Sequence, residues 1–151
     1  MLKKILLTLF IALIIIQFFH PKKNVSAAPG PNHIEATHAV PPAVKGILEK
    51  ACYDCHSDNT RYPWYNNVQP VAWWLAHHVD EGKNELNFSQ FGSYAAKRQA
   101  HKLEEVSEMV KEHHMPLESY EWLHSDAKLT PEEVKTLTDW ADALRATIPG
   151  A

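Results

Sequence analysis

Apolar residues recur along most of this chain at intervals of three and four positions, the spacing of one face of an α-helix. This pattern predicts helices over residues 42–53, 70–82 and 93–113, and a last helix that starts at Pro131. No segment shows the strict alternation of apolar and polar residues that marks a half-buried strand. We therefore expect residues 42–151 to form one small all-α domain.

The last helix has the clearest predicted start. Thr130 is a favoured N-cap residue, Pro131 is well tolerated in a first helical turn, and Glu133 completes the pattern of a capping box. The expected buried face consists of apolar residues at helical spacing: Val134, Leu137, Trp140, Ala141 and Leu144.

The helix expected over residues 93–113 carries an apolar stripe that we assign to the core: Leu103, Val106, Met109 and Val110. Met109 is then an ordinary core methionine. Charged residues of both signs, including Lys102 and Glu105, occupy the other faces and are expected to be solvated.

Residues 1–23 have the pattern of an export signal. Lys3 and Lys4 precede an apolar run over residues 5–19, which as a helix would reach about 22 Å, short of a hydrocarbon core of roughly 30 Å. The small residues 25–27 that could form a cleavage site lie beyond two further lysines. We favour an uncleaved anchor over a cleaved signal, since snorkelling lysines and local thinning can accommodate a short span. In either case we expect the domain on the periplasmic side of the cytoplasmic membrane.

Residues 24–41 are rich in proline and lack periodic hydrophobicity, so we interpret them as a linker. His33 and His38 lie in this segment and are expected to be solvated. The formal net charge of the 151-residue chain is −3, which gives no basic excess for a nucleic-acid partner.

The Cys-x-x-Cys-His motif at residues 52–56 contains both cysteines of the chain. It is typical of the attachment site of a c-type haem. Cys52 and Cys55 are spaced so that each can form a thioether with one haem vinyl group, and His56 then serves as the proximal ligand of the iron. We expect one covalently bound haem c.

Met115 is the best candidate for the second axial ligand, because a thioether suits haem iron and Pro116 holds this residue outside a helix. His113 and His114 are alternatives that would give a haem with two histidine ligands. His78 shares an apolar face with neighbouring residues and could be a ligand, contact a propionate or pack in the core.

Three further residues near the motif are candidates for the haem pocket. Tyr62 and Trp64 belong to an aromatic loop that could form a pocket wall or fill a small core. Arg61 could pair with a haem propionate or remain on the surface.

Several stretches together resemble a class I monohaem cytochrome c and, more closely, the bacterial haem-binding domain family of small exported proteins. They are Cys52-Tyr53-Asp54-Cys55-His56-Ser57, Tyr62-Pro63-Trp64-Tyr65, Pro70-Val71 with Trp73, His78-Val79-Asp80-Glu81-Gly82, Leu86-Asn87-Phe88-Ser89, Met115-Pro116-Leu117 with Tyr120, and Leu129-Thr130 with Glu133 and Trp140. The resemblance covers residues 41–148 and implies a helical domain around one haem. Members of this family have no single agreed physiological role.

These observations favour single-electron transfer between redox partner proteins, which the sequence does not identify. The main alternative is a haem peroxidase or a redox or gas sensor with an open distal face, in which His77, His78, His113 and His114 could supply acid–base groups. A third hypothesis is a zinc site formed by Cys52, Cys55, His56 and another histidine, although the usual second pair of ligands is missing.

Overall fold

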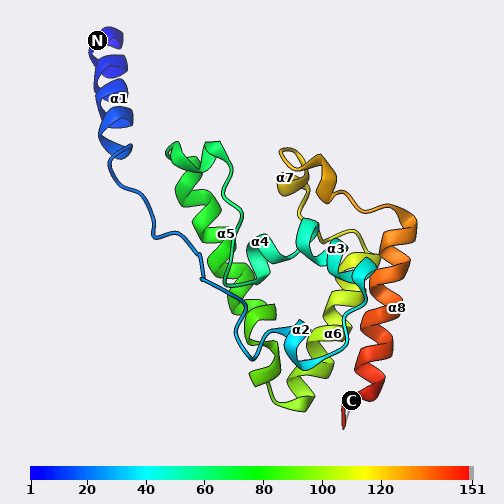
Figure 1. The fold of residues 1–151 in the computed structure, drawn as a ribbon. Coiled ribbons are helices and arrows are strands. Elements are labelled where there is room, and N and C mark those ends of the chain that lie inside the picture. The colour runs from blue at the N-terminus through cyan, green and yellow to red at the C-terminus, as the bar shows by residue number, and fades with distance from the viewer. Residues whose placement is uncertain (150–151) are drawn as a thin grey trace.

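The computed structural model describes residues 1–149, and within them the chain is all-helical, as the apolar spacing predicts (Figure 1). α denotes α-helices and η denotes 3-10 helices. In chain order they are α1 (Leu2–Ile16), α2 (Ile34–Thr37), α3 (Pro42–Ala51), α4 (Tyr53–His56), η1 (Trp64–Asn67), α5 (Val71–Glu85), η2 (Phe88–Ser93), α6 (Ala96–Lys111), α7 (Glu118–Glu121), η3 (Ser125–Ala127) and α8 (Pro131–Thr147).

The hydrophobic core lies where α3, α6, α8 and η2 meet. α6 and α8 pack side by side, and α3 packs against α8 (Figure 1). Leu48, Leu103 and Leu137 are fully buried from these three helices, and Phe88 and Phe91 join them from η2. The core therefore occupies one side of the domain.

α8 begins where the sequence predicts. The Thr130 side chain accepts a hydrogen bond from the Glu133 backbone N–H at 3.2 Å, and the Glu133 carboxylate accepts one from the Thr130 N–H at 2.9 Å. This reciprocal capping box satisfies two donors at the helix start. Its predicted buried face is confirmed at Leu137, Trp140 and Ala141.

α5 stands on the other side of the domain and is only thinly packed. Its buried residues are Ala72 and Val79, and it contacts α4 and η1. The apolar spacing that puts His78 on a buried face also includes Trp74, which is 42% exposed in the structure. The helix also continues to Glu85, beyond the predicted end at Gly82.

The second half of the predicted linker belongs to the folded domain. His33 is 6% exposed and its ring meets the edge of Tyr53, with 5.4 Å between ring centroids. His38 packs against Phe91 in the same way. The prediction that these histidines are solvated is therefore wrong, because α2 packs against η2 and carries both of them onto the core.

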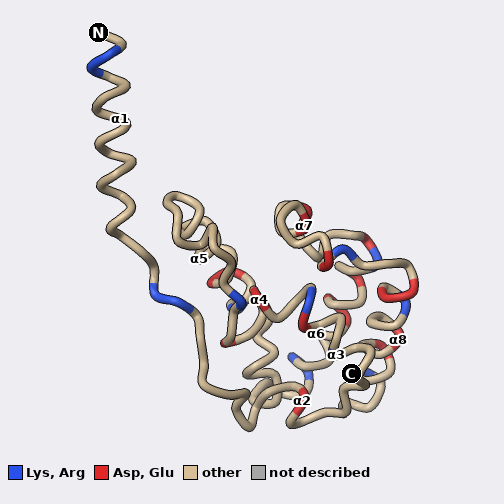
Figure 2. Tube along the Cα trace, turned by 45° about the horizontal axis from the view of Figure 1, so that its top comes forward, with Lys and Arg blue, Asp and Glu red and all other residues tan. Residues whose placement is uncertain are grey.

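α1 projects away from the domain, with its apolar side chains largely exposed (Figure 1). In Figure 2 it is an uncharged segment between two short cationic ones, which contain Lys3 and Lys4 and then Lys22 and Lys23. Within residues 1–149, no helix combines the length and the apolar character needed to cross a membrane.

Candidate cofactor site

The motif at residues 52–56 sits on a helical turn of its own. α3 ends at Ala51, and Cys52 departs from helical geometry with φ −126° and ψ −47°. The Cys52 carbonyl then accepts hydrogen bonds from the N–H groups of Cys55 and His56, at 3.2 and 2.9 Å. The predicted helix over residues 42–53 is therefore interrupted at the first cysteine.

Both cysteines are free thiols. Burial raises the pKa of Cys52 to about 12 and the pKa of Cys55 to about 11, and neighbouring negative charge adds to both shifts. Both side chains are therefore protonated at neutral pH when no group is bound to them.

His56 is held in one tautomer by α5 and the residue that follows it. Its Nδ1 lies 2.9 Å from the Gly82 carbonyl oxygen and 3.0 Å from that of Leu86. Because carbonyls only accept, Nδ1 carries the proton, and the lone pair of Nε2 is left for a ligand. Burial lowers the pKa of His56, which favours the neutral ring. A donated Nδ1–H bond of this kind orients metal-binding histidines generally.

Two adjoining cavities meet at His56. The first has a volume of about 260 Å³ and a mainly apolar wall. The wall is formed chiefly by Cys52, Leu86, Phe88, Val106, Met109 and Val110.

The second cavity has a volume of about 490 Å³ and a more polar wall, and each volume is on the scale of small-ligand and cofactor pockets. Its own lining includes Cys55, His78, Gly82, Asn84, Leu117 and Tyr120. The residues that line both cavities are Ala51, His56, Glu85, Met115 and Pro116. One cysteine of the motif thus lines each cavity, and the imidazole lies between them.

Met115 is the only one of the four predicted second-ligand candidates that lines both cavities with His56. α6 ends at Lys111, and the positive φ of 57° at His113 turns the chain toward the cavities. His113 and His114 are exposed and line neither cavity. Met109 lines the first cavity and is 36% exposed, so its assignment to the core is wrong.

His78 lines the second cavity. Its Nε2 is buried without a hydrogen-bond partner among the described residues, and its ring meets the edge of Trp74 with centroids 4.6 Å apart. α5 also supplies the Gly82 carbonyl to Nδ1 of His56, and the two nitrogens of an imidazole point in roughly opposite directions. α5 therefore lies on the same side as His56 of any group that is bound at Nε2. Because His78 belongs to α5, it is poorly placed to bind the opposite face of that group.

Arg61, Tyr62 and Trp64 do not line either cavity. The Tyr62 hydroxyl accepts a hydrogen bond from the Asn24 N–H at 2.7 Å, and Trp64 is 79% exposed. The aromatic loop lies outside both cavities because it packs against the start of α5. The structure thus gives no support to the wall predicted from it.

The Arg61 guanidinium pairs with Asp54 inside the motif, at 3.1 Å from Nη2 to Oδ2. This hydrogen bond raises the pKa of Arg61. Tyr120 donates to the same carboxylate at 2.6 Å, and burial together with this bond raises the pKa of its hydroxyl. Arg61 therefore holds the Cys-x-x-Cys-His motif from outside the cavities.

Lys102 lines the first cavity, contrary to its assignment to a solvated face. Its side chain is only 11% exposed and pairs with Glu105 at 2.5 Å and with Glu85 at 3.4 Å. Burial opposes its charge, but the two carboxylates raise its pKa overall. The spacing of residues 102, 106 and 109 places all three on one helix face, and this signal could have identified Lys102 as a residue of the cavity wall.

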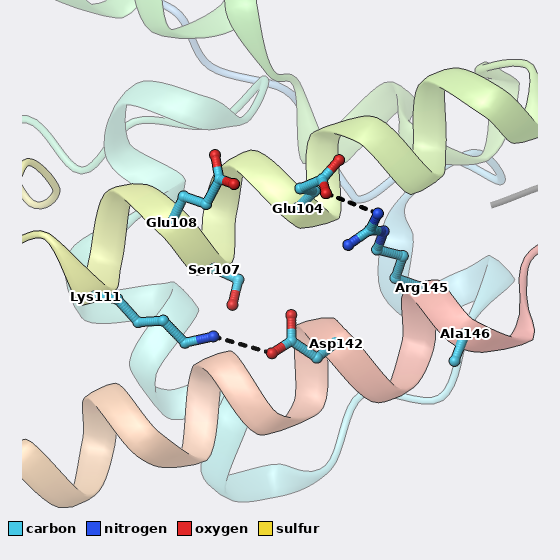
Figure 3. Close-up of a pocket in the computed structure, with 7 residues that line it drawn as sticks. All are labelled: Glu104, Ser107, Glu108, Lys111, Asp142, Arg145 and Ala146. Atoms are coloured by element: carbon cyan, nitrogen blue, oxygen red, sulfur yellow. Dashed lines mark hydrogen bonds and ion pairs between the residues drawn. The ribbon is translucent and has the colours of Figure 1, made fainter.

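A further hollow of about 520 Å³ lies between α6 and α8 and contains none of the predicted site residues (Figure 3). Lys111 pairs with Asp142 at 3.0 Å and Arg145 with Glu104 at 2.7 Å across it. These ion pairs connect the two helices at the surface. The cavities beside His56 are the candidate cofactor site, because they contain predicted site residues and this hollow does not.

A family model described as "Haem-binding domain" matches residues 11–143, most of the chain. The chain belongs to the haem-binding domain family. Haem is therefore the cofactor that the cavities beside His56 are expected to hold. No curated protein and no solved structure matches the chain.

The residues of the site suit a haem. A haem-binding domain needs an apolar cavity and an imidazole whose free nitrogen faces it, and both are present beside His56. A zinc centre fits poorly, since residues 1–149 contain no group of three or more His, Cys, Asp or Glu side chains placed to hold a metal ion.

Proposed function

We propose that this haem-binding domain carries one covalently attached haem c and transfers single electrons. Cys52 and Cys55 form the two thioethers, His56 is the proximal ligand and Met115 is the distal ligand. Bound haem supplies an iron that changes its oxidation state by one electron. We further propose that the protein acts on the outer side of the cytoplasmic membrane, where residues 1–23 hold it.

The observation that carries this proposal is the shared position of His56 and Met115. Both line the two adjoining cavities, although in the sequence His56 precedes α5 and Met115 follows α6. Nδ1 of His56 is fixed by two carbonyls, so its Nε2 needs no reorientation to bind a metal. A thioether opposite an imidazole is a ligand pair that raises the reduction potential.

The remaining residues hold and shield the site. Phe88, Val106 and Val110 give the first cavity an apolar wall that excludes water. Lys102 places a cation in that wall, which suits a propionate, since a charge-assisted hydrogen bond to a carboxylate is strong. Of the four histidines that could supply acid–base groups, His78 lines the second cavity, whereas His77, His113 and His114 are exposed and line neither cavity.

The proposal is tested with the haem-loaded full chain. A pyridine haemochrome spectrum taken after acid–acetone extraction should show haem that stays with the protein. The untreated protein should be low-spin when reduced and should bind carbon monoxide slowly. Met115→Leu should open the distal face and lower the reduction potential by on the order of 100 mV, because axial ligands set haem potentials over roughly 0.8 V.

Met109→Leu is the matched control, because Met109 is the other methionine that lines the first cavity. It should leave the spectrum and potential unchanged. If Met115→Leu behaves like the unmodified protein, Met115 is not the ligand. If the unmodified protein binds carbon monoxide rapidly and turns over peroxide, the open-faced peroxidase or sensor replaces electron transfer.

A further inference from the structure

One end of the molecule exposes an unusual number of large apolar side chains. After residue 25, six of them are between 41% and 79% exposed: Trp64, Val68, Trp73, Trp74, Trp122 and Leu123. We call these six residues the aromatic end. Four of the five tryptophans of the chain belong to it, while Trp140 lies in the core.

The aromatic end is built from two segments far apart in the sequence. Trp64 and Val68 lie in and after η1, and Trp122 and Leu123 directly follow α7. The Tyr65 hydroxyl lies 3.1 Å from Nε2 of His124 and joins the two segments. Both segments, with the first turns of α5, lie at the same end of the domain in Figures 1 and 2.

α1 projects from this same end, and its last residues are bonded to it. The Gln17 side chain exchanges two hydrogen bonds with the Gln69 backbone, at 2.9 and 3.2 Å. The Gln69 side chain donates to the Phe19 carbonyl at 2.6 Å. The C-terminal end of the apolar helix is therefore level with the aromatic end (Figure 1).

We propose that the aromatic end rests in the headgroup region of the bilayer that holds α1. This inference rests on the proposed membrane attachment and deepens it. Tryptophan favours the membrane interface, because its ring is apolar while its N–H still reaches water. With α1 embedded, its bonded end brings the tryptophans to the level where the bilayer meets water.

Charge plays a minor part in this contact. Glu118 and Glu121 lie on α7 beside the aromatic end, whereas Lys22 and Lys23 follow α1, so neither sign dominates. The apolar rings therefore provide the attraction, and anionic lipid is not required. The arrangement fixes the orientation of the domain, and hence of the cofactor cavities, relative to the membrane.

The test places nitroxide spin labels on the haem-loaded full chain in phosphatidylcholine vesicles. Four single variants are compared: Trp64→Cys and Trp122→Cys at the aromatic end, Leu9→Cys in α1, and Lys97→Cys at the start of α6, at the opposite end of the domain (Figure 1). The collision rate of each label is measured with oxygen, which concentrates in lipid, and with a polar nickel chelate, which stays in water.

We expect the labels at residues 9, 64 and 122 to prefer oxygen, and the label at residue 97 to prefer the chelate. If residue 9 is in lipid while residues 64 and 122 behave like residue 97, the inference is overturned and the anchor stands. If residue 9 is in water, both membrane attachment and the inference fail. The unmodified chain should take up no label, since both cysteines are bonded to haem; uptake would instead count against the covalent haem.

Discussion

Buried polar contacts hold the residues around the haem motif in place. Asp54, inside the motif, binds Arg61 and Tyr120, as described above. Asp58, two residues after the motif, accepts hydrogen bonds from Lys83 at 2.8 Å, Asn87 at 2.9 Å and Gln90 at 3.0 Å. These bonds connect the motif to α5 and η2, so a single carboxylate fixes the exit of the chain from the cofactor site.

Asp58 should make the stability of the protein depend on pH. Partial burial would raise its pKa, but the bonds from Lys83, Gln90 and Asn87 outweigh burial and lower it to about 2. Because the pKa of Asp58 is lower in the folded state than in the unfolded state, its ionised carboxylate stabilises the protein at pH values above the unfolded-state pKa of about 4. This contribution disappears as the pH falls to about 2. Asp58→Asn should therefore cost about 2 kcal/mol at pH 7 and almost nothing near pH 2.

The measurement is urea unfolding of the haem-loaded protein and of Asp58→Asn across this pH range. Asp126→Asn serves as a control on an exposed carboxylate. A difference between the Asp58 variant and the unmodified protein that stays constant with pH would contradict the assignment.

Among the contacts between elements, the one between α4 and α5 is critical for the position of His56. A Cβ atom added at Gly82 would lie 2.8 Å from the Cys55 carbonyl oxygen, closer than backbone atoms tolerate. The absence of a side chain at this position lets α5 approach the motif closely. That approach brings the Gly82 carbonyl within 2.9 Å of His56 Nδ1.

Gly82→Ala should therefore push α5 away from the motif and destabilise the protein by about 1–3 kcal/mol. It should also weaken the hydrogen bond from His56 Nδ1, which makes the ring a less basic ligand and therefore raises the reduction potential. Gly46→Ala is the matched control, since Gly46 is exposed in α3 with no atom within 4 Å of the added Cβ. It should stabilise by about 0.5–1 kcal/mol, as expected for glycine replaced inside a helix. Equal effects of the two variants in unfolding measurements would rule out the close-approach argument.

Local signals in the sequence were sufficient for the long helices and for the centre of the site. The capping box at Thr130, and the burial of Leu103 in α6 and of Leu137 in α8, depend only on neighbours within a helix, and the structure confirms them. The Cys-x-x-Cys-His spacing likewise identified the motif, and the Pro116 turn singled out Met115, which lines the same cavities as His56.

Features that depend on contacts between distant segments could not be predicted in this way. The segment around His33 has no apolar period, and its burial comes from packing against Tyr53 and η2. The helical spacing can place Lys102 beside the cavity, but its ion pair with Glu85, which ends α5, depends on a contact between two helices. The sequence left open whether the aromatic loop forms a pocket wall or fills a small core, because it does not specify which side of α5 the loop packs against.

In the whole molecule, the cofactor cavities separate two unequal halves. α6 and α8 with α3 form the half that holds most of the core, whereas α5 buries only Ala72 and Val79. The cavity walls come from both halves: Glu85 and Leu86 on one side, and Val106 and Met115 on the other. A cofactor bound there would therefore contact both halves and hold them together in the folded state.

Removing the attachment should loosen α5 more than α8. The double variant Cys52→Ala/Cys55→Ala lacks both proposed thioethers, so the thinly packed α5 should open locally, while Leu137, Trp140 and Ala141 keep α8 in the core. Hydrogen exchange followed helix by helix should show a larger loss of amide protection in α5 than in α8. His56→Ala, which retains both thiols but removes a ligand, should show the same order with a smaller loss. An equal loss of protection in α5 and α8 would mean that the two halves fold as one cooperative unit and that the cofactor does not join them.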